Sequence, residues 1–269
     1  MKLIVLLAAI LCCTPAFSQK RDTIYTYNKT IVCKIKEVAD ENVKYSYPDE
    51  DILVSINKNR IKKISYSSGR KEVFAENTDH QEVNGWEDWT KVVTTTIDDE
   101  VDGLFKLGDV SSKVKAGTAL SNLNKIKNKA LRKIKIRAAM IGANVIHLSS
   151  DHTEGHRYNA WTNSTNTAEV ILTGVAYSNR TLNINEFKKV VERRNNFRLI
   201  EIVQMPYNKK SPTIVPGKMT PVNLKNYTVE GLHAFVEYKG DKFRVLSASL
   251  NQVVLMREGK RRTYNYILK

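Results

Sequence analysis

The sequence predicts an α+β protein, with a ferredoxin-like middle domain flanked by two small all-β modules. Alternating apolar and polar runs fill both ends of the chain. A long helical pattern lies near the centre, and turn-forming residues and prolines separate these regions. The predicted boundaries are a signal peptide at 1–18, a β-meander at 19–78, an α/β sandwich at 86–205, a Pro-rich linker at 206–222 and an SH3-like β module at 223–269.

Residues 1–18 have the pattern of a secretory signal peptide. Lys2 supplies a positive charge, an apolar run follows from Leu3 to Leu11, and Ala16-Phe17-Ser18 forms a small-x-small cleavage site. This predicts an exported protein, periplasmic or secreted. Past the signal, no apolar run is long enough to span a membrane.

The three cysteines limit how the chain could be anchored to lipid and whether it could form disulfides. Cys12 and Cys13 lie in the signal, and neither follows the small residue that normally precedes an acylated cysteine. A lipoprotein is therefore the less favoured alternative. The mature chain keeps only Cys33, so it has no internal disulfide, and the alternating run 31–35 predicts a buried, unreactive thiol.

The N-terminal stretch 22–75 consists of short alternating runs such as TIVCKIKEV, NVKYSY and RIKKISY, separated by turn-forming clusters. Five or six strands with period two predict a meander that rolls into a small barrel or curled sheet. The stretch resembles the β-modules near the start of exported Gram-negative bacterial proteins of unknown role. That resemblance implies export and names no activity.

A long helical pattern runs from about Ala119 to Ile141, with its apolar residues on one stripe. Gly142 follows where a helix needs a left-handed residue, and Asn183 or Asn185 can cap a second helix that ends at Arg194. The order strand-helix-strand-strand-helix-strand predicts the ferredoxin-like sandwich. Its strands are expected at 91–97, 103–110, 143–149, 168–177 and 197–205.

The C-terminal part returns to strands after a segment that contains four prolines. These prolines mark 206–222 as a linker. The 47 residues from 223 to the end form alternating runs, with hairpin turns at Lys239-Gly240-Asp241 and between Arg257 and Arg262. They predict a second small barrel, which either stands alone or pairs with the N-terminal meander.

The middle segment carries an ordered set of short motifs: Leu107-Gly108-Asp109-Val110, Ala138-Ala139, Gly142-Ala143-Asn144-Val145-Ile146 and Gly174-Val175-Ala176-Tyr177. In this set it resembles the soluble domain of the Rcs envelope-stress sensor lipoprotein and small bacterial domains labelled heavy-metal-binding. The resemblance covers a quarter to a third of the chain. It implies an envelope location, a sensing or partner-binding role and no catalysis.

The charge pattern favours anionic partners. The formal net charge is +15, and it becomes +14 when Lys2 leaves with the signal. No acidic residue lies between Asp109 and Asp151, so one side of the domain is expected to be strongly positive. An envelope protein, an anionic glycan or a lipid headgroup is the expected partner. Nucleic acid is disfavoured because the helix lacks stacking aromatics. The candidate contacts are Lys125, Lys129, Arg132, Lys133, Lys135 and Arg137.

Two further groups of residues are candidate contacts in the stretch that follows the helix. The polar segment 150–167 is expected to be a long loop, in which Tyr158 and Trp161 could hold a sugar or a partner. The alternative function is a metal-binding or metal-sensing site for a divalent transition ion, because imidazole and carboxylate ligands gather within ten residues. Its candidate ligands are His147, Asp151, His152 and His156.

Catalytic motifs are absent from the sequence. It has no Gly-x-Ser-x-Gly elbow, no His-Glu-x-x-His helix, no phosphate-binding glycine loop and no Cys-His context around Cys33. The sequence therefore predicts a non-catalytic, exported envelope protein without a required cofactor, which binds a partner or an anionic surface. It does not predict an oligomeric state.

Overall fold

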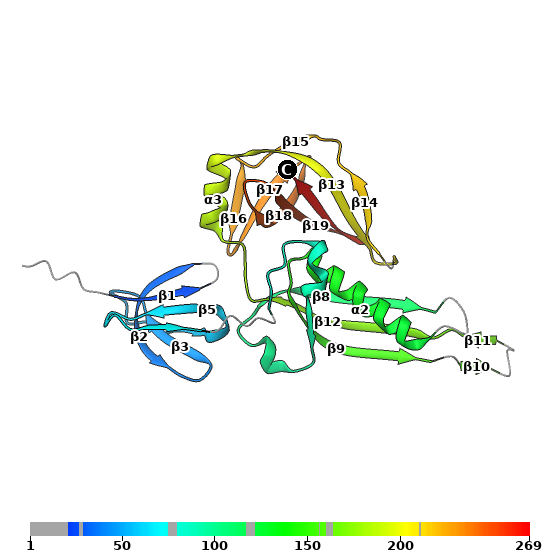
Figure 1. The fold of residues 1–269 in the computed structure, drawn as a ribbon, viewed down its shortest axis with the longest axis horizontal. Coiled ribbons are helices and arrows are strands. Elements are labelled where there is room, and N and C mark those ends of the chain that lie inside the picture. The colour runs from blue at the N-terminus through cyan, green and yellow to red at the C-terminus, as the bar shows by residue number, and fades with distance from the viewer. Residues whose placement is uncertain are drawn as a thin grey trace, which may run out of the picture.

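The computed structural model describes residues 21–26, 29–74, 80–116, 122–155, 157–159, 164–209 and 211–269, with only the backbone at 157–159 and 164–166. The fold is α+β and dominated by sheets, with the helices α2 (Leu123–Met140) and α3 (Ile184–Arg193). The N-terminal sheet lies beside the middle sheet, and the C-terminal sheet stacks above it (Figure 1). Within the described residues, no helix is long and apolar enough to cross a membrane.

The N-terminal module is a six-stranded antiparallel sheet. Its strands are β1 (Asp22–Thr26), β2 (Thr30–Val38), β3 (Asn42–Ser46), β4 (Val54–Asn57), β5 (Ile61–Ser65) and β6 (Lys71–Val73), with the 3-10 turn η1 (Lys58–Arg60). The spatial order is β4-β3-β2-β1-β5-β6. The number of strands matches the sequence prediction, but β1 pairs with both β2 and β5. The sheet therefore curls around its first strand and is not a simple meander.

Cys33 lies in the core of this module. It is buried with Ile24, Ile31 and Val43, as the alternation of β2 predicts. Burial raises the pKa of the Cys33 thiol to about 11, with a smaller contribution from the nearby Asp22 carboxylate. The thiol is therefore protonated at neutral pH and is a poor nucleophile.

Asp22 stabilises the sheet by accepting two backbone hydrogen bonds, from Ile35 N at 2.9 Å and from Ser67 N at 2.7 Å. Burial acts to raise the pKa of Asp22, but the Ser67 and Ile35 amides favour the carboxylate and the net pKa lies below the ordinary value. A carboxylate with a depressed pKa in the folded state stabilises the fold at neutral pH. That stabilisation is lost as the pH falls through the folded-state pKa.

Replacing Asp22 with asparagine should lower the free energy of unfolding by about 1–2 kcal/mol at neutral pH, because a single amide oxygen replaces two charged acceptors. The difference between wild type and variant should shrink as the pH falls toward about 3. Urea unfolding at a series of pH values measures both effects. A difference that does not change with pH would show that the charge of Asp22 is irrelevant.

The N-terminal module contacts the middle module at the first residue of β8 (Phe105–Lys115) and in the turn before it. Asn57 Nδ2 donates to Asp102 Oδ2 at 3.1 Å, and Asn59 Nδ2 donates to the Asp102 carbonyl at 3.2 Å. The Arg60 guanidinium lies 4.0 Å from the centre of the Phe105 ring. These contacts tie the N-terminal module to the start of the middle module.

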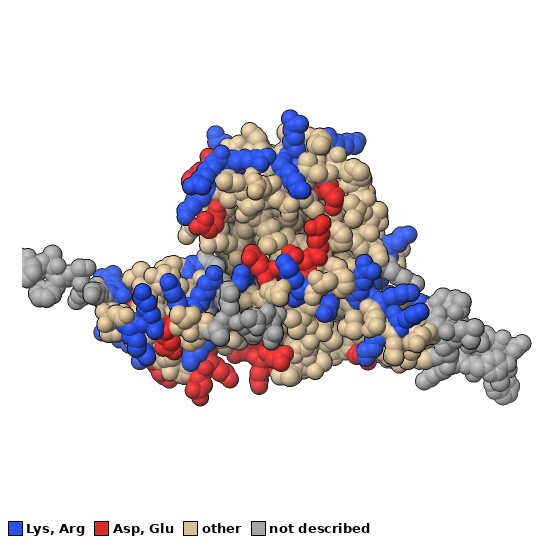
Figure 2. Space-filling model, in the orientation of Figure 1, with Lys and Arg blue, Asp and Glu red and all other residues tan. Residues whose placement is uncertain are grey.

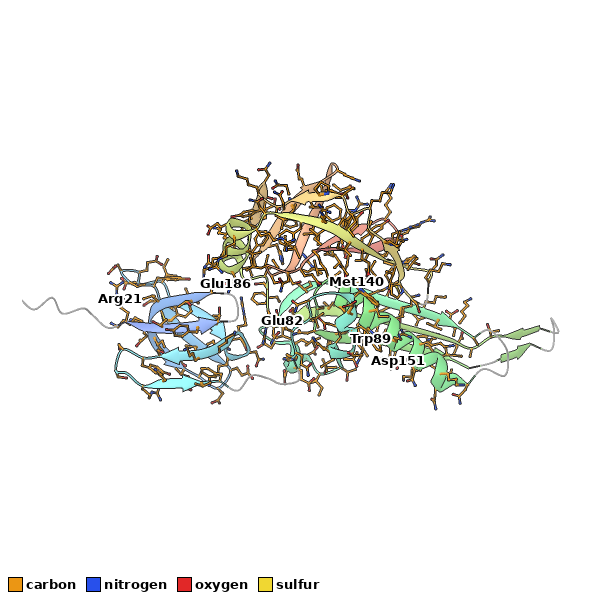
Figure 3. The ribbon with its side chains drawn as sticks, turned by 45° about the horizontal axis from the view of Figure 1, so that its top comes forward. Arg21, Glu82, Trp89, Met140, Asp151 and Glu186 are labelled. Carbon is orange, nitrogen blue, oxygen red and sulfur yellow. The ribbon has the colours of Figure 1, made fainter. Side chains whose placement is uncertain are left out.

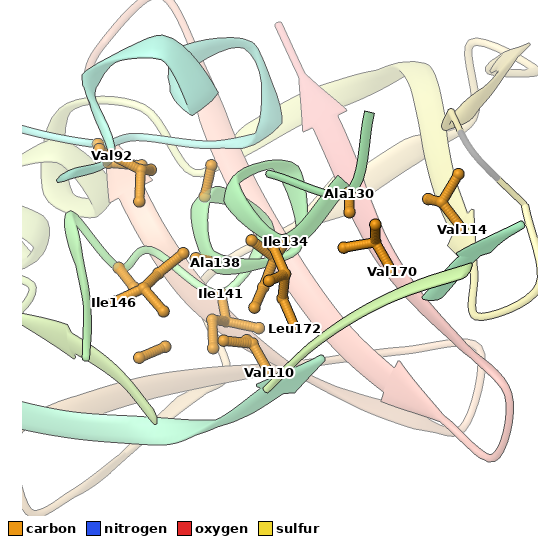
Figure 4. Close-up of a cluster of buried hydrophobic side chains, with 14 of the residues drawn as sticks. Val92, Val110, Val114, Ala130, Ile134, Ala138, Ile141, Ile146, Val170 and Leu172 are labelled. Carbon is orange, nitrogen blue, oxygen red and sulfur yellow. The ribbon is translucent and has the colours of Figure 1, made fainter. Parts of the chain in front are cut away.

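The middle sheet has four strands in the order β7-β9-β12-β8, with β7 parallel to β9 and the other pairs antiparallel. Helix α2 packs on one face through Ala130, Ile134 and Ala138, against Val170 and Leu172 of the sheet (Figure 4). The small alanines let the helix lie close to the strands. Besides β8, the strands of the middle sheet are β7 (Val93–Thr95), β9 (Val145–Glu154) and β12 (Glu169–Ser178). The middle module also contains the short 3-10 turns η2 (Trp86–Lys91) and η3 (Asp98–Val101).

Both ends of α2 have capping interactions. Asn122 Oδ1 accepts hydrogen bonds from Asn124 N at 2.8 Å and Lys125 N at 3.4 Å. Gly142 has φ +78° and its N–H donates to Ala139 O, while Ala143 N donates to Ala138 O, which together form a Schellman motif. The predicted glycine stop is confirmed. The helix begins at Leu123, and residues 117–121 lie outside the described part of the chain.

The sandwich predicted at 86–205 requires a correction. Helix α3 and strand β13 (Asn196–Pro206), which were its second helix and last strand, belong to the C-terminal module. Phe187 and Val191 of α3 pack in the C-terminal core together with Phe197 and Leu199 of β13. The alternation of β13 fits either sheet, and its pairing with the last strand decides between them.

The C-terminal module is an eight-stranded sheet that begins at β13, so the boundary predicted at 223 is wrong. Its other strands are β14 (Thr213–Pro216), β15 (Pro221–Asn223), β16 (Tyr227–Glu230), β17 (His233–Tyr238), β18 (Asp241–Ala248), β19 (Val253–Gly259) and β20 (Arg262–Leu268). The main path is β14-β13-β20-β19-β18-β17-β16. Both predicted hairpin turns are present, between β17 and β18 and between β19 and β20.

The predicted linker 206–222 is also wrong, because much of it folds back onto β13. Strand β14 pairs with β13 at 201–204, and β15 pairs with it at 196–198. Pro216 and Pro221 are the last and first residues of these short strands. Proline lacks an N–H and is tolerated at the ends and edges of sheets, so the prolines shorten the strands without excluding them.

Candidate functional site

Helix α2 lies between two sheets and does not form a solvated outer layer. One side packs on the middle sheet, while Ile136 and Met140 pack against Val203, Met205 and Ile267 of the C-terminal sheet. Trp86 and Trp89 line the edge of this second interface, and Figure 3 shows Trp89 and Met140 where the two bodies meet. Only part of the helix surface therefore remains open to a partner.

Two of the predicted contact residues, Lys133 and Arg137, are not on the surface. Lys133 is 1% exposed and its Nζ donates to Lys113 O at 3.1 Å and Tyr207 O at 2.9 Å. Arg137 is 6% exposed and donates to Ser111 O and, at 3.4 Å, to Pro206 O. Both side chains join β8 to the end of β13. They are structural residues, and their assignment to a binding surface was wrong.

Arg137 keeps its charge in this environment. Burial lowers the pKa of Arg137 to about 10, which still leaves the guanidinium protonated at neutral pH. The Tyr207 ring covers it, with 4.6 Å between the guanidinium carbon and the ring centre. A charged group that carbonyl oxygens and an aromatic face surround is a specific joint between two modules.

The remaining cations of α2 are exposed, paired with an acidic residue or half-buried, depending on their position along the helix. Lys125, Lys129 and Arg132 are exposed, and they form no ion pair among the described residues. Lys127 pairs with Asp151 at 2.7 Å, and this contact lowers the pKa of the Asp151 carboxyl. Lys135 is half-buried, and burial lowers its pKa. The exposed cations therefore reduce to three.

These three residues, the basic stripe, share one line along the helix because their spacing is four and three. The same line continues through Ile136 and Met140, which the C-terminal sheet covers. The stripe therefore changes from charged to apolar where that sheet begins. Arg132 also lies over the Trp89 ring, 5.3 Å from its centre. Figure 2 shows Lys and Arg gathered over this end of α2 and the neighbouring end of β8.

Lys113 and Lys115 of β8 do not extend the basic stripe. Both pair with Glu169 of β12, at 2.5 Å and 3.1 Å. The ammonium of Lys113 and then that of Lys115 lower the pKa of the Glu169 carboxyl. These strand residues alternate with Val114, which packs toward α2, so their side chains lie on the opposite face of the sheet.

The predicted metal ligands do not converge. On β9, His147 pairs with Val175 and His152 pairs with Ile171, positions four residues apart on β12. This places the two histidines roughly 13 Å apart along the sheet, whereas an imidazole nitrogen binds zinc at about 2 Å. His147 Nε2 lies 3.2 Å from Asp98 Oδ1, and Asp151 is paired with Lys127.

Within the described part of the chain, no group of three or more His, Cys, Asp or Glu residues could hold a metal ion. His156 lies outside the described residues. The structure therefore separates the ligands that the sequence placed within one short stretch.

The polar segment 150–167 is not one continuous loop. Strand β9 continues to Glu154, and β10 (Arg157–Asn159) pairs with β11 (Ser164–Asn166). Figure 1 shows this hairpin extending beyond the sheet. Tyr158 lies on β10, where only the backbone is described, and Trp161 lies outside the described residues. The side chains of Tyr158 and Trp161 lie outside the described part of the chain, so their predicted contact with a sugar or a partner stays a prediction.

A polar cleft lies where the three modules meet, and sequence reasoning missed it. Its volume is about 510 Å³, and Lys62, Asn144, Glu186 and Arg244 from all three modules contribute to its lining. Figure 3 shows Glu82 and Glu186 at this junction. No local motif could reveal the cleft, because its walls come from segments that are distant in the sequence.

Asn144 fixes the floor of this cleft. It is 1% exposed, and its Nδ2 donates to Asn179 Oδ1 at 2.6 Å and to Gln81 O at 3.1 Å. Its Oδ1 accepts from Asn179 N at 3.3 Å. The Gly-Ala-Asn motif gave one local signal for this role, since an asparagine at a tight turn can satisfy free backbone groups.

No protein-family model matches the chain, and no curated protein or solved structure is significantly similar to it. The resemblance of the middle segment to the Rcs stress-sensor domain and to the domains labelled heavy-metal-binding therefore stays a prediction. The same holds for the N-terminal resemblance to exported β-modules. Functional inference rests on the residues and their geometry.

Proposed function

We propose that the protein is a non-catalytic, exported component of a bacterial cell envelope that binds an acidic partner protein through the basic stripe, with a role in envelope sensing. The observation that carries this proposal is the stripe itself, Lys125, Lys129 and Arg132. These cations remain exposed and form no ion pair among the described residues, beside a sheet that buries the rest of the same helical line. The signal-like segment 1–18 supports export, periplasmic or secreted.

The surroundings of the stripe favour a protein over a simple polyanion. Arg132 lies over Trp89, and Tyr207, which is 47% exposed, covers Arg137 nearby. Arginine and aromatic side chains supply much of the energy at protein interfaces. A surface with three cations, one of which lies over the Trp89 ring, offers both charge attraction and apolar contact. A glycan or lipid headgroup would use mainly the charges.

The charges set the rate and specificity of this association. Complementary charges steer partners together and disfavour partners of the same sign. Exposed charges are screened over about 8 Å at physiological salt. Binding through the stripe should therefore weaken as salt is added. This salt dependence distinguishes binding through the stripe from binding through a purely apolar surface.

Replacing Lys125, Lys129 and Arg132 with glutamate should reduce retention on outer-membrane fractions by about 100-fold at low salt, since three attractions become repulsions. Quantitative pull-down with those fractions measures the change, and in-cell crosslinking with mass spectrometry identifies the partner. Protein adducts that the triple variant loses support the proposal. Retention on purified lipid or glycan alone would show that the stripe binds an anionic surface and not an acidic protein.

The matched control replaces Lys188, Arg193 and Lys225 with glutamate. These exposed residues lie elsewhere, and the net charge changes by the same amount. The control should keep its retention. Equal loss in both triple variants would show that only the overall charge matters, and unchanged retention in the stripe variant would refute the proposed surface.

A further inference from the structure

We propose that the polar cleft at the junction of the three modules is a binding site for a small carboxylate-bearing molecule, such as the free C-terminus of a short peptide. Its volume of about 510 Å³ lies within the range of small-molecule sites. The walls come from the segment that begins at Glu82, the turn at Gly142, the start of α3, strands β17 and β18, and the turn after β18. This site is distinct from the basic stripe.

Arg244 is the positive anchor of the cleft. Its Nη2 donates to Ile141 O at 2.6 Å, which holds the guanidinium at the C-terminal end of α2. Its Nε is buried and has no hydrogen-bond partner among the described residues. A guanidinium held by one nitrogen, with another one free to donate, is suited to bind a carboxylate oxygen.

Two further polar side chains line the same wall. His233 and Gln252 line the cleft, and among the described residues the contacts of their side chains include no hydrogen bond. Burial, and then the charge of Arg244, lower the pKa of His233, so the ring is neutral at neutral pH. A neutral imidazole can donate to a carboxylate, and a carboxamide can both donate and accept.

The opposite wall carries carboxylates that are already paired. Glu82 Oε2 accepts from Arg180 at 3.2 Å, and Glu186 Oε1 accepts from Lys189 at 2.8 Å. The charged residues of the lining are Lys62, Arg180, Arg244, Glu82 and Glu186, so their net charge is +1. A net charge of one matches one carboxylate better than a doubly charged phosphate, since a second negative charge would lack a partner.

The remaining lining favours a peptide-like ligand. Gln252 presents a carboxamide that can hydrogen-bond to a peptide amide, and Asn183 presents its Nδ2 because its Oδ1 already accepts from Glu186 N. The Ser249 hydroxyl in the lining is already bonded to the backbone of its own turn. Among the described residues, Phe187 is the one Phe, Tyr or Trp in the lining, and at 1% exposure it is unable to stack on a sugar. Leu107 and Leu246 supply an apolar wall.

The test titrates the isotope-labelled full chain with triglycine, with triglycine amide and with inorganic phosphate, each up to about 10 mM, and follows side-chain NMR signals. Triglycine should shift the His233 and Gln252 signals, and the amide should not. His233→Ala and Gln252→Leu should each weaken triglycine binding at least ~10-fold. Arg244→Gln should abolish it.

His152→Ala is the control, because His152 is an exposed histidine on β9, outside the lining of the cleft. It should bind triglycine as wild type does. His233→Ala and Gln252→Leu keep the test valid if Arg244→Gln disturbs the end of α2. Stronger shifts with phosphate, shifts of equal size with the amide, no shifts at all, or undiminished binding in both wall variants would each overturn the proposal.

Discussion

Replacing Arg137 with alanine is expected to lower the free energy of unfolding by about 3 kcal/mol, a large effect for a single change. The side chain joins the middle sheet to the C-terminal module through its hydrogen bonds to Ser111 O and Pro206 O. Hydrogen bonds to charged groups contribute more than neutral ones, and buried carbonyls that lose their donor are costly. The lost contact with Tyr207 adds to the effect.

The measurement is thermal and urea unfolding of Arg137→Ala and of the control Lys129→Ala. Both changes introduce alanine, the best helix former, so intrinsic helix propensity does not oppose either one. The control should stay within about 0.5 kcal/mol of wild type because Lys129 is exposed. The midpoint of Arg137→Ala should fall by roughly 8 °C. Equal stability of the two variants would show that the joint is dispensable.

Replacing Asn144 with alanine is expected to remove a buried hydrogen-bond network and to lower the free energy of unfolding by about 3 kcal/mol. The change removes the donor to Asn179 Oδ1 and Gln81 O and the acceptor of Asn179 N. Asn179 is 2% exposed, so water cannot readily replace the missing partner. The segment before η2 and the end of β12 should then separate from the turn after α2.

Hydrogen exchange and urea unfolding of Asn144→Ala test this expectation, with Asn251→Ala as the control. Asn251 is exposed, and its side chain forms no hydrogen bond among the described residues. The Asn144 variant should exchange faster at 80–84 and 177–179, and the control should not. If protection at those segments is unchanged, the hydrogen-bond network at the floor of the cleft does not hold them.

Several elements could be predicted because their signals are local. The strands of the N-terminal module follow from alternation with period two. The stop of α2 follows from Gly142, where φ is +78° and an added Cβ would lie 3.3 Å from Leu246. Asn183 Oδ1 accepts from Glu186 N at 3.2 Å, so the predicted cap of α3 is confirmed.

The mistaken predictions have one physical origin. A short stretch of sequence does not specify which distant segment it will pack against or pair with. Strand β13 reads equally well as the last strand of a sandwich or as a strand of the C-terminal sheet, and its pairing with β20 decides the matter. Lys133 and Arg137 read as surface cations because the helix pattern cannot show that a second sheet covers that side. The histidines of β9 are close in sequence but extend along a strand.

The amino-acid sequence alone determined the α+β class, most strand and helix positions, the buried thiol of Cys33 and the excess of positive charge. Tertiary structure decided which of the helix cations face solvent, which sheet receives β13 and α3, and where the cleft forms. Backbone dihedral preferences and periodicity act over a few residues, so the sequence expresses them directly. Burial and convergence depend on contacts between distant segments, which only the assembled sheets create.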